Sequence, residues 1–395
     1  MAYKIRMAII RPFGSPFSTG FYNSQEIGLA RGLSKCNINV DVYAAGAGKQ
    51  VKCTNIESSG IGKVRLFEVP FRRIPSIDQA FYPKLFALLR QEDYQFIQVN
   101  EENELTSFLV VRFAHSRGIP VAIYQGMYQQ MIGRIYAAFQ RCYDLLLLPS
   151  LIKNIDMAFV KTSRAGKHLQ NKGFNNITIL PVGLDPTPFA QYKERNWRAE
   201  LRIPKQSKII LYVGIFERRR NVDFMIDLAK KMQGDDIVLV MAGTGPEHSR
   251  ITERVEKEKT NNVRIAGMVD QQSLPGLYRE SSLFLLPSDY EIYGMVVLEA
   301  MYFGIPVMST YTAGPEDIIV DGIDGFLMAD LDCNTWAAKI RNALIDTEHL
   351  SEMSNNAAHK VSKHLCWDAI ATDYNGYIRN IMNSKGIGGM MLNER

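Results

Sequence analysis

LFLLPSDYEIYGMVVLEAM, residues 283–301, is the stretch from which the fold can be worked out. Residues 283–287 form an apolar run of strand length, and a loop follows that turns at Gly294. A helix is expected to begin near Met295, where a mostly apolar stretch of helical length starts. A buried strand, a short loop and a helix in this order make half of a βαβ unit, the building block of parallel sheets.

The same alternation of strands and helices recurs along the chain in two series. The first series has predicted strands at 5–10, 40–44, 96–99 and 121–124, with a helix at 24–33. The second has predicted strands at 209–216, 237–242, 263–266, 283–287 and 306–309, with helices at 223–232, 247–259, 273–280 and 295–303. Continuous apolar strands are typical of parallel sheets covered on both faces. We therefore predict an α/β protein with two doubly wound, Rossmann-like domains facing each other across a cleft.

The composition is that of an ordinary globular protein and excludes several classes. Of the 395 residues, 46% are apolar and 22% are charged. No apolar stretch approaches the roughly 18–20 residues of a membrane span, and residues 1–11 are typical of a strand and not of a signal peptide. Five scattered cysteines and six histidines without ligand spacing predict neither disulfides nor a metal site, so we expect a cytoplasmic protein that binds no metal.

Two glutamates flank the predicted start of the helix in the opening stretch. After the turn at Gly294, the backbone N–H groups of Met295 and Val296 carry the positive end of the helix dipole and can hold a phosphate. Glu291 lies in the loop and Glu299 one turn inside the helix. Carboxylates do not bind an anion, so we expect both to accept hydrogen bonds from hydroxyl groups on either side of it. A capping or surface role for both glutamates is the alternative.

Three consecutive arginines, residues 218–220, follow the strand predicted at 209–216. Ligands bind at the carboxyl ends of strands in doubly wound sheets. We therefore expect at least one of the three guanidinium groups to hold a diphosphate and to neutralise it as a leaving group. A solvated run of charge is the alternative.

Taken together, these residues resemble the retaining glycosyltransferases of family 4, which have the GT-B fold. The resemblance covers nearly the whole chain and is strongest over residues 205–330. It rests on the Glu-x7-Glu pair of Glu291 and Glu299, within an ordered series of short motifs. These are VG at 213–214, RRN at 219–221, AGTGP at 242–246, LPS at 286–288, EAM at 299–301, GIPV at 304–307 and GIDGF at 322–326.

The resemblance also suggests how the chain is divided. Residues 181–185 resemble the hinge of the family, and four prolines lie between 181 and 204. We predict an acceptor-side domain at 1–185, a linker at 186–204 and a nucleotide-sugar-binding domain at 205–365. A closing helix at 366–384, with Trp367 and Tyr374, would return to the first domain, and 385–395 would form a flexible tail.

The resemblance implies a role for each site residue. Glu291 would contact the transferred sugar and Glu299 the ribose hydroxyls. Arg220 falls on the diphosphate-binding lysine of the family, with Arg219 beside it. The other donor-binding positions would be Gly20, Gln125, Met268, Val269, Gly294, Met295 and Val296.

Three positions depart from the family pattern. Ile215 replaces an arginine, so Arg218 or Arg219 must supply that charge. Ile292 replaces a glycine. Gln125 replaces a histidine, and an amide can form hydrogen bonds but cannot act as a base near neutral pH.

The prediction for function is a retaining, metal-independent, hexosyltransferase-like enzyme. It would move a sugar from a nucleotide-diphosphate-sugar donor to a glycan, lipid-linked or small-molecule acceptor, with no cofactor and no nucleic-acid partner. Two alternatives remain open: a nucleotide-sugar epimerase of the same fold, and a non-catalytic nucleotide-sugar-binding partner subunit, which Gln125 and Ile215 favour.

The charge is distributed unevenly along the chain. Residues 1–185 hold 22 Lys and Arg against 13 Asp and Glu, while the remainder holds 24 against 28. A helix predicted at 131–148 is amphipathic and carries Arg134 and Arg141. We predict peripheral contact between this basic domain and the inner face of the cytoplasmic membrane. The alternative is a helix buried against the sheet with its arginines in solvent.

Overall fold

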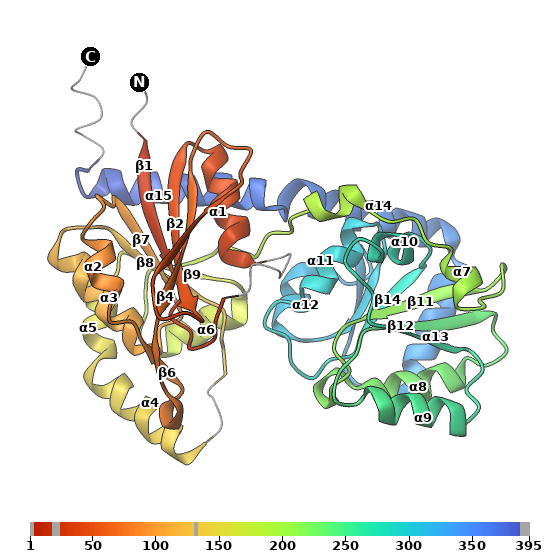
Figure 1. The fold of residues 1–395 in the computed structure, drawn as a ribbon. Coiled ribbons are helices and arrows are strands. Elements are labelled where there is room, and N and C mark those ends of the chain that lie inside the picture. Colours follow the sequence, from red (N-terminus) through yellow and green to blue (C-terminus); the bar gives the residue numbers. More distant parts are fainter. Residues whose placement is uncertain (1–3, 18–23, 130–132, 388–395) are drawn as a thin grey trace. The chain divides into compact units, whose positions relative to one another are not determined.

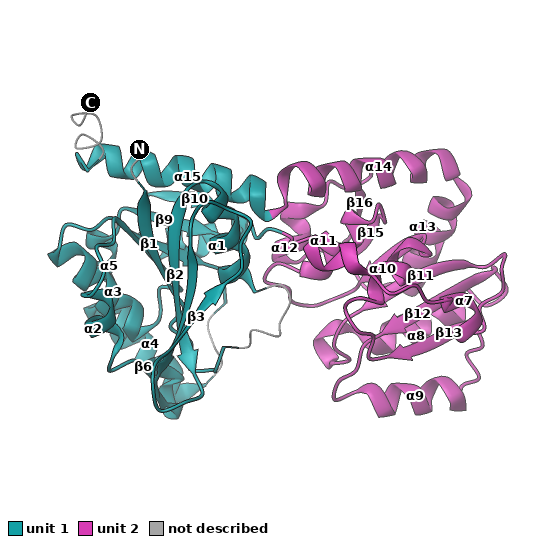
Figure 2. Cartoon of the chain, turned by 45° about the horizontal axis from the view of Figure 1, so that its top comes forward, with its two compact units in different colours: residues 1–183, 367–395 teal, residues 184–366 magenta. Residues whose placement is uncertain are grey.

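A computed structural model of the chain describes residues 4–17, 24–129 and 133–387. The chain forms two compact units (Figures 1 and 2). Unit 1 consists of Met1–Gly183 and Trp367–Arg395, and unit 2 of Leu184–Cys366. Each unit is built around its own mainly parallel sheet. Among the described residues, no helix is long and apolar enough to cross a membrane.

Within the described part of unit 1, the sheet has eight strands, and only the edge strand at Lys52–Ile56 runs antiparallel to its neighbour. In spatial order they are β10 (Ile177–Ile179), β9 (Met157–Val160), β8 (Val121–Gln125), β7 (Phe96–Asn100), β1 (Ile5–Ile10), β2 (Ile38–Gly46), β4 (Val64–Pro70) and β3 (Lys52–Ile56). A separate hairpin pairs β5 (Arg72–Ile74) with β6 (Gln79–Phe81). Strands β7 and β8 are buried throughout, and the apolar-run criterion detects them; β3 is mostly exposed and is missed, as are β4 and β9.

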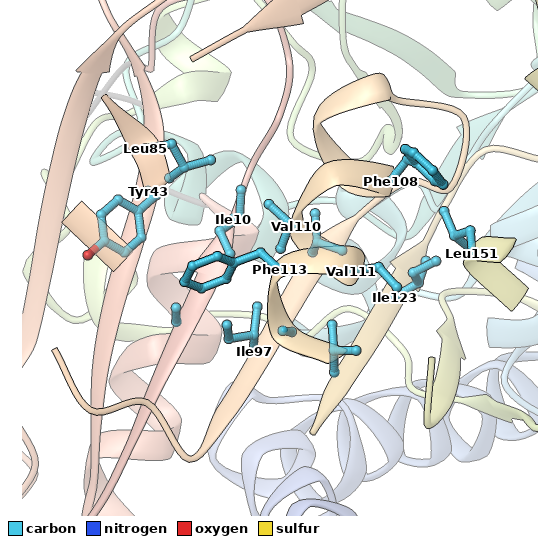
Figure 3. Packing of buried hydrophobic residues seen from close by; sticks show 14 of the residues in the cluster. Ile10, Tyr43, Leu85, Ile97, Phe108, Val110, Val111, Phe113, Ile123 and Leu151 are labelled. Atoms are coloured by element: carbon cyan, nitrogen blue, oxygen red, sulfur yellow. The ribbon is translucent and has the colours of Figure 1, made fainter. Parts of the chain in front are cut away.

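Helices cover this sheet and complete its core. They are α1 (Gln25–Lys35), α2 (Leu85–Leu89), α3 (Leu105–Ser116), α4 (Arg134–Leu146), α5 (Leu148–Asn154), α6 (Ser163–Asn171) and α15 (Trp367–Ser384). Figure 3 shows Val110, Val111 and Phe113 of α3 packed beside Ile97 and Ile123 of the sheet. Burying these side chains is the main force that holds α3 on the sheet.

Helix α15 packs on α1 although it ends the described chain (Figure 2). Gly28 of α1 makes this possible, because an added Cβ would lie 2.1 Å from Trp367 Nε1. Further along α15, the Tyr374 hydroxyl donates to Gln98 Oε1 of β7 at 2.7 Å. The chain therefore returns to unit 1 after completing unit 2.

Unit 2 has six strands, all parallel. In spatial order they are β13 (Val263–Gly267), β12 (Ile237–Ala242), β11 (Lys208–Val213), β14 (Leu283–Leu286), β15 (Val307–Thr310) and β16 (Gly325–Met328). Its helices are α7 (Trp197–Glu200), α8 (Val222–Lys231), α9 (His248–Lys257), α10 (Leu274–Arg279), α11 (Met295–Tyr302), α12 (Ala313–Ile318), α13 (Cys333–Ile345) and α14 (Thr347–His364). The prediction of two doubly wound α/β domains is confirmed.

The unit boundaries differ from those expected at two places. The boundary falls after Gly183, and residues expected to form a linker pack into unit 2, where Phe189 and Trp197 are buried. Aromatic side chains of this size bury too much apolar surface to be left in a free linker. In the expected tail, Lys385 forms an ion pair with Asp156 at 2.6 Å, and residues 388–395 lie outside the described part.

The helix expected at 131–148 is also different. Residues 131 and 132 are not among those described, α4 ends at Leu146, and α5 begins at Leu148 with Pro149 in its first turn. Proline has no N–H and its ring clashes with the carbonyl one turn earlier, so a single helix cannot continue through it.

Candidate functional site

The order of strands in unit 2 indicates where a ligand would bind. From β11 the chain winds outward through β12 and β13, then crosses to the other side of β11 at β14. The loops that follow β11 and β14 diverge at this switch point, and such crevices are where open α/β sheets bind ligands. The predicted arginines lie on the loop after β11, and Glu291 lies on the loop after β14.

Arg219 and Arg220 converge on Glu291. Glu291 is 4% exposed and forms an ion pair with Nη1 of Arg220. Arg219 Nη1 lies 3.9 Å from Glu291 Oε1 and donates to the Tyr290 carbonyl at 2.8 Å. The loops that follow two different strands therefore bring two cations and a buried carboxylate together.

Glu217 holds the same two arginines from the other side. Its Oε1 lies 2.6 Å from Arg219 Nη2 and 3.7 Å from Arg220 Nε. Burial lowers the pKa of Arg220 from its ordinary value, the effect expected for a cation that is partly removed from water.

Arg218 does not belong to this cluster. Its side chain is 93% exposed and approaches only Glu247, at 3.7 Å. Of the two residues that could replace the charge missing at Ile215, the structure places Arg219 beside Glu291. A solvated run of charge describes Arg218 alone.

Sequence reasoning assigned no role to Asn221 and Asp289, the residues that join the two loops. Asn221 has a positive φ of 51°, and its Nδ2 donates to the Pro287 carbonyl at 2.8 Å and to Asp289 Oδ1 at 2.7 Å. The Asp289 backbone N–H in turn donates to the Arg219 carbonyl at 2.8 Å. Two signals were available for Asn221: its place in the RRN motif, and the tolerance of asparagine for the left-handed conformation.

Helix α11 begins as expected, at Met295, directly after Gly294. This glycine has a φ of 83°, and the Val297 N–H donates to its carbonyl at 2.9 Å, so the chain turns sharply into the helix. The N–H groups of Met295 and Val296 lie in the first turn, where helical N–H groups have no intrahelical acceptor. A phosphate could be bound here.

Glu299 lies deeper in unit 2. It is 3% exposed, and its Oε2 accepts a hydrogen bond from the Tyr278 hydroxyl of α10 at 2.9 Å. Burial raises the pKa of Glu299 to about 8. The surface alternative is thus wrong for both glutamates, and no sequence pattern pointed to Tyr278.

The remaining predicted residues are not part of this cluster. Met268, just after β13, is 82% exposed, and Val269 is half-buried. Gln125 belongs to unit 1, where its Oε1 accepts from the Glu102 N–H at 2.9 Å and its Nε2 donates to the Met127 carbonyl at 3.0 Å. Gly20 is outside the described residues. Among those described, no three His, Cys, Asp or Glu side chains are grouped to hold a metal, and metal independence stays a prediction.

Comparison with known proteins bears on the fold and on the class of activity. Residues 193–360, which lie within unit 2, match the family model of glycosyl transferases group 1. An uncharacterized glycosyltransferase of Methanocaldococcus jannaschii is 24% identical over 88% of this chain and 90% of its own length. Among solved structures, the sucrose-phosphate synthase of Thermosynechococcus elongatus superposes with a TM-score of 0.72 at 19% identity, over 96% of this chain and 100% of that one. The Anabaena protein HepE in complex with UDP superposes with a TM-score of 0.71 at 14% identity, over 95% of this chain and 100% of that one.

The two mainly parallel sheets and these structural likenesses define a protein of the GT-B fold. The family match over most of unit 2 and the likeness to a glycosyltransferase over 88% of this chain support glycosyltransferase activity.

Proposed function

We propose that this chain is a retaining, metal-independent glycosyltransferase that uses a nucleotide-diphosphate-sugar donor bound at the switch point of unit 2. One observation carries the proposal: Arg219 and Arg220 converge on the buried carboxylate of Glu291, next to the start of α11. The HepE structure, which has a similar fold, contains UDP, which is in keeping with a nucleotide donor.

The arginines would carry the electrostatic part of the reaction. When the bond between sugar and diphosphate breaks, negative charge grows on the leaving diphosphate. Guanidinium groups already held in place by Glu217 and Glu291 can stabilise that charge without reorganising. The N–H groups at the start of α11 would add to the same effect. These groups supply positive charge of the kind that a divalent cation supplies in other transferases.

The two glutamates would act on the hydroxyl groups of the donor. Glu291 would orient the transferred sugar, because its carboxylate contacts both Arg219 and Arg220, which would hold the diphosphate. Glu299 would accept a hydrogen bond from the ribose, in addition to the one from Tyr278.

A donor panel tests this function. Purified protein would be incubated with UDP-, GDP- and ADP-linked hexoses and a mixture of saccharide and lipid-linked acceptors, and nucleotide release would be measured. We expect release with one nucleotide class and dependence on acceptor. Formation of an inverted sugar nucleotide without acceptor would favour the epimerase, and nucleotide binding without release under any acceptor would favour the partner subunit.

We further propose that α4 contacts an anionic membrane surface, where a lipid-linked acceptor would be available. Its buried face includes Tyr136 and Tyr143, while Ile135, Leu145 and Leu146 are between 66% and 76% exposed. Arg134 and Arg141 are exposed on the same helix. One face of the helix therefore packs on unit 1, as expected for a helix that is buried on one side. Its other face presents apolar and basic side chains to solvent, which is the combination that interfacial helices use.

A further inference from the structure

A second switch point lies in unit 1. From β1 the chain winds through β2 and β4 on one side, and it returns on the other side at β7. The turn that follows β7 has the sequence Glu101-Glu102-Asn103-Glu104. Three carboxylates in a buried or half-buried turn are expensive to maintain unless they are hydrogen-bonded or serve a ligand.

This turn is held rigidly from two sides. Glu101 has a φ of 58°, and its carboxylate accepts from the backbone N–H groups of Gly126 and Met127 at 3.0 and 3.2 Å. The Tyr143 hydroxyl of α4 donates to the Glu102 carbonyl at 2.5 Å. The Glu101 carboxylate is thus hydrogen-bonded to the backbone of the neighbouring loop. The Glu102 side chain does not take part in these bonds.

Glu102, Asn103 and Gln140 line one cavity, and each has a buried oxygen that no described residue hydrogen-bonds. These atoms are Glu102 Oε2, Asn103 Oδ1 and Gln140 Oε1. Glu102 and Gln140 are 1% and 4% exposed. The Gln140 amide orientation is set by Asp144, whose Oδ1 accepts from Nε2 at 2.7 Å, so the oxygen is the end left over. All three unpartnered atoms are acceptors.

The charges around the cavity favour one kind of ligand group over others. Lys172 Nζ lies 2.6 Å from Glu102 Oε1 and 3.3 Å from Asp144 Oδ1, and His168 Nε2 lies 3.6 Å from the same Glu102 oxygen. Burial raises the pKa of the nearby Glu104 to about 8, which leaves that carboxyl mainly uncharged at neutral pH. A ligand ammonium would be repelled by the positive charge of Lys172. A ligand anion would be repelled by the three unpartnered acceptor oxygens. A hydroxyl group satisfies the acceptors without adding charge.

We infer that the turn at 101–104 and α4 form a subsite for the hydroxyl groups of a neutral saccharide. The cavity admits only about one water-sized group, so a sugar hydroxyl enters it while the ring stays outside. The inference rests on the proposed function, because an acceptor saccharide is the ligand that function provides. It goes further by excluding acceptors whose contacting end is a phosphate, a carboxylate or an amine.

Ligand-observed NMR titration of the full-length protein tests the subsite. The probes are the methyl α-glycosides of glucose, mannose and galactose, with the corresponding hexose 6-phosphates and 2-amino sugars as charged counterparts. We expect at least one neutral glycoside to bind about tenfold more tightly than its charged counterparts. Gln140→Leu keeps the approximate size and removes the acceptor, and it should weaken that glycoside about tenfold, as should Glu102→Gln, which disturbs the Lys172 pairing. Gln170→Leu, at an exposed position of α6, should bind like the parent.

Titration of UDP, GDP and ADP in the same samples separates this inference from the proposed function. Nucleotide binding with no saturable glycoside binding would refute the saccharide subsite and leave the proposed transferase function standing. Glycoside binding without any nucleotide binding supports the subsite and removes the transferase. Tighter binding of a phosphate or amino sugar, or unchanged glycoside binding by Gln140→Leu of parental thermal stability, also overturns the subsite. If Gln140→Leu loses stability, Glu102→Gln decides by the same criterion.

Discussion

Arg220 and Glu291 are each largely removed from water, and each depends on the charge of the other. Exposed ion pairs contribute little to stability, but a buried carboxylate that loses its partner is strongly destabilising. The Arg220 side chain is 14% exposed and that of Glu291 is 5%. Replacing either residue therefore affects folding as well as chemistry, and experiments must measure both.

Arg220→Ala should reduce turnover by roughly 100-fold or more, because a preorganised cation that stabilises the leaving diphosphate is lost. Donor binding should fall less, and Arg219→Ala should behave similarly. Steady-state assays of nucleotide release, with thermal unfolding alongside, give both quantities. Arg218→Ala is the matched control, since that side chain is 93% exposed, and should retain parental turnover. Full activity of a folded Arg220→Ala protein would refute the assignment.

Glu299 makes stability depend on pH. Its pKa in the folded protein is about 8, above the ordinary 4.5, so between these values the folded state holds a proton that the unfolded chain releases. This contribution to stability is complete below about pH 4.5 and is lost as pH rises through about 8. Urea unfolding at pH 5, 6.5 and 8 should show this decline, and Glu299→Gln should flatten it.

Glu104, with a pKa also raised to about 8, contributes in the same direction, so the decline should shrink without disappearing in Glu299→Gln. Glu253→Gln, exposed on α9, is the control and should leave the slope unchanged. An identical slope in parent and Glu299→Gln would contradict the buried, protonated state.

At the scale of elements, close approach of backbones decides how α15 joins unit 1. The helix packs on α1 where two small residues, Gly28 and Gly32, leave room for Trp367 and Ala371. A methyl group at Gly32 would lie 2.7 Å from both the Trp367 carbonyl oxygen and the Ala371 Cβ. The pairing is thus specified by missing side chains, which hydrophobic periodicity does not detect.

Gly28→Ala should destabilise unit 1 by about 1–3 kcal/mol, because the new methyl group overlaps the Trp367 ring and forces the helices apart. Urea unfolding followed by tryptophan fluorescence measures this. Gly376→Ala is the control: it lies within α15 with nothing near its Cβ position, and should be neutral or stabilise by up to about 1 kcal/mol. Equal stability of Gly28→Ala and Gly376→Ala would contradict the docking.

At the scale of the whole molecule, charge is divided between the two parts of the chain. Residues 1–185 hold an excess of nine basic residues, 22 against 13, and the remainder an excess of four acidic ones, 28 against 24. A field of one sign attracts oppositely charged surfaces and is screened by salt. The exposed basic and apolar residues of α4 give this attraction a defined place in unit 1.

Sedimentation with anionic liposomes should show binding at low salt that weakens at high salt, because each basic residue near the surface contributes about 1 kcal/mol. Arg134→Gln with Arg141→Gln should reduce binding, and Leu145→Ser with Leu146→Ser should remove the part that resists salt. Vesicles of neutral lipid are the control. Absence of binding at low salt would remove the membrane proposal, and an unchanged salt response in the arginine variant would move the contact away from α4.

Prediction from sequence was most successful for continuously buried elements. Strands β1 and β12 have the bounds that their apolar runs indicated, and α11 begins at Met295 as Gly294 predicted. Short strands such as β10 and the exposed edge strand β3 were missed, because their burial is set by neighbours and not by an apolar run. Glu291 and the arginines were recognisable because they follow predicted strands.

What the sequence determined by itself is local: the apolar strands, the turn at Gly294 and the positions of charged residues at strand ends are all properties of short segments. Tertiary structure decided which of these segments meet. The convergence of Arg219 and Arg220 on Glu291, the pairing of Glu299 with Tyr278, the exclusion of Arg218 and the docking of α15 on Gly28 join residues by backbone crossing and close packing. These contacts arise only when the sheets form, because strand order at a switch point is set by the packing of the whole unit and by no single segment.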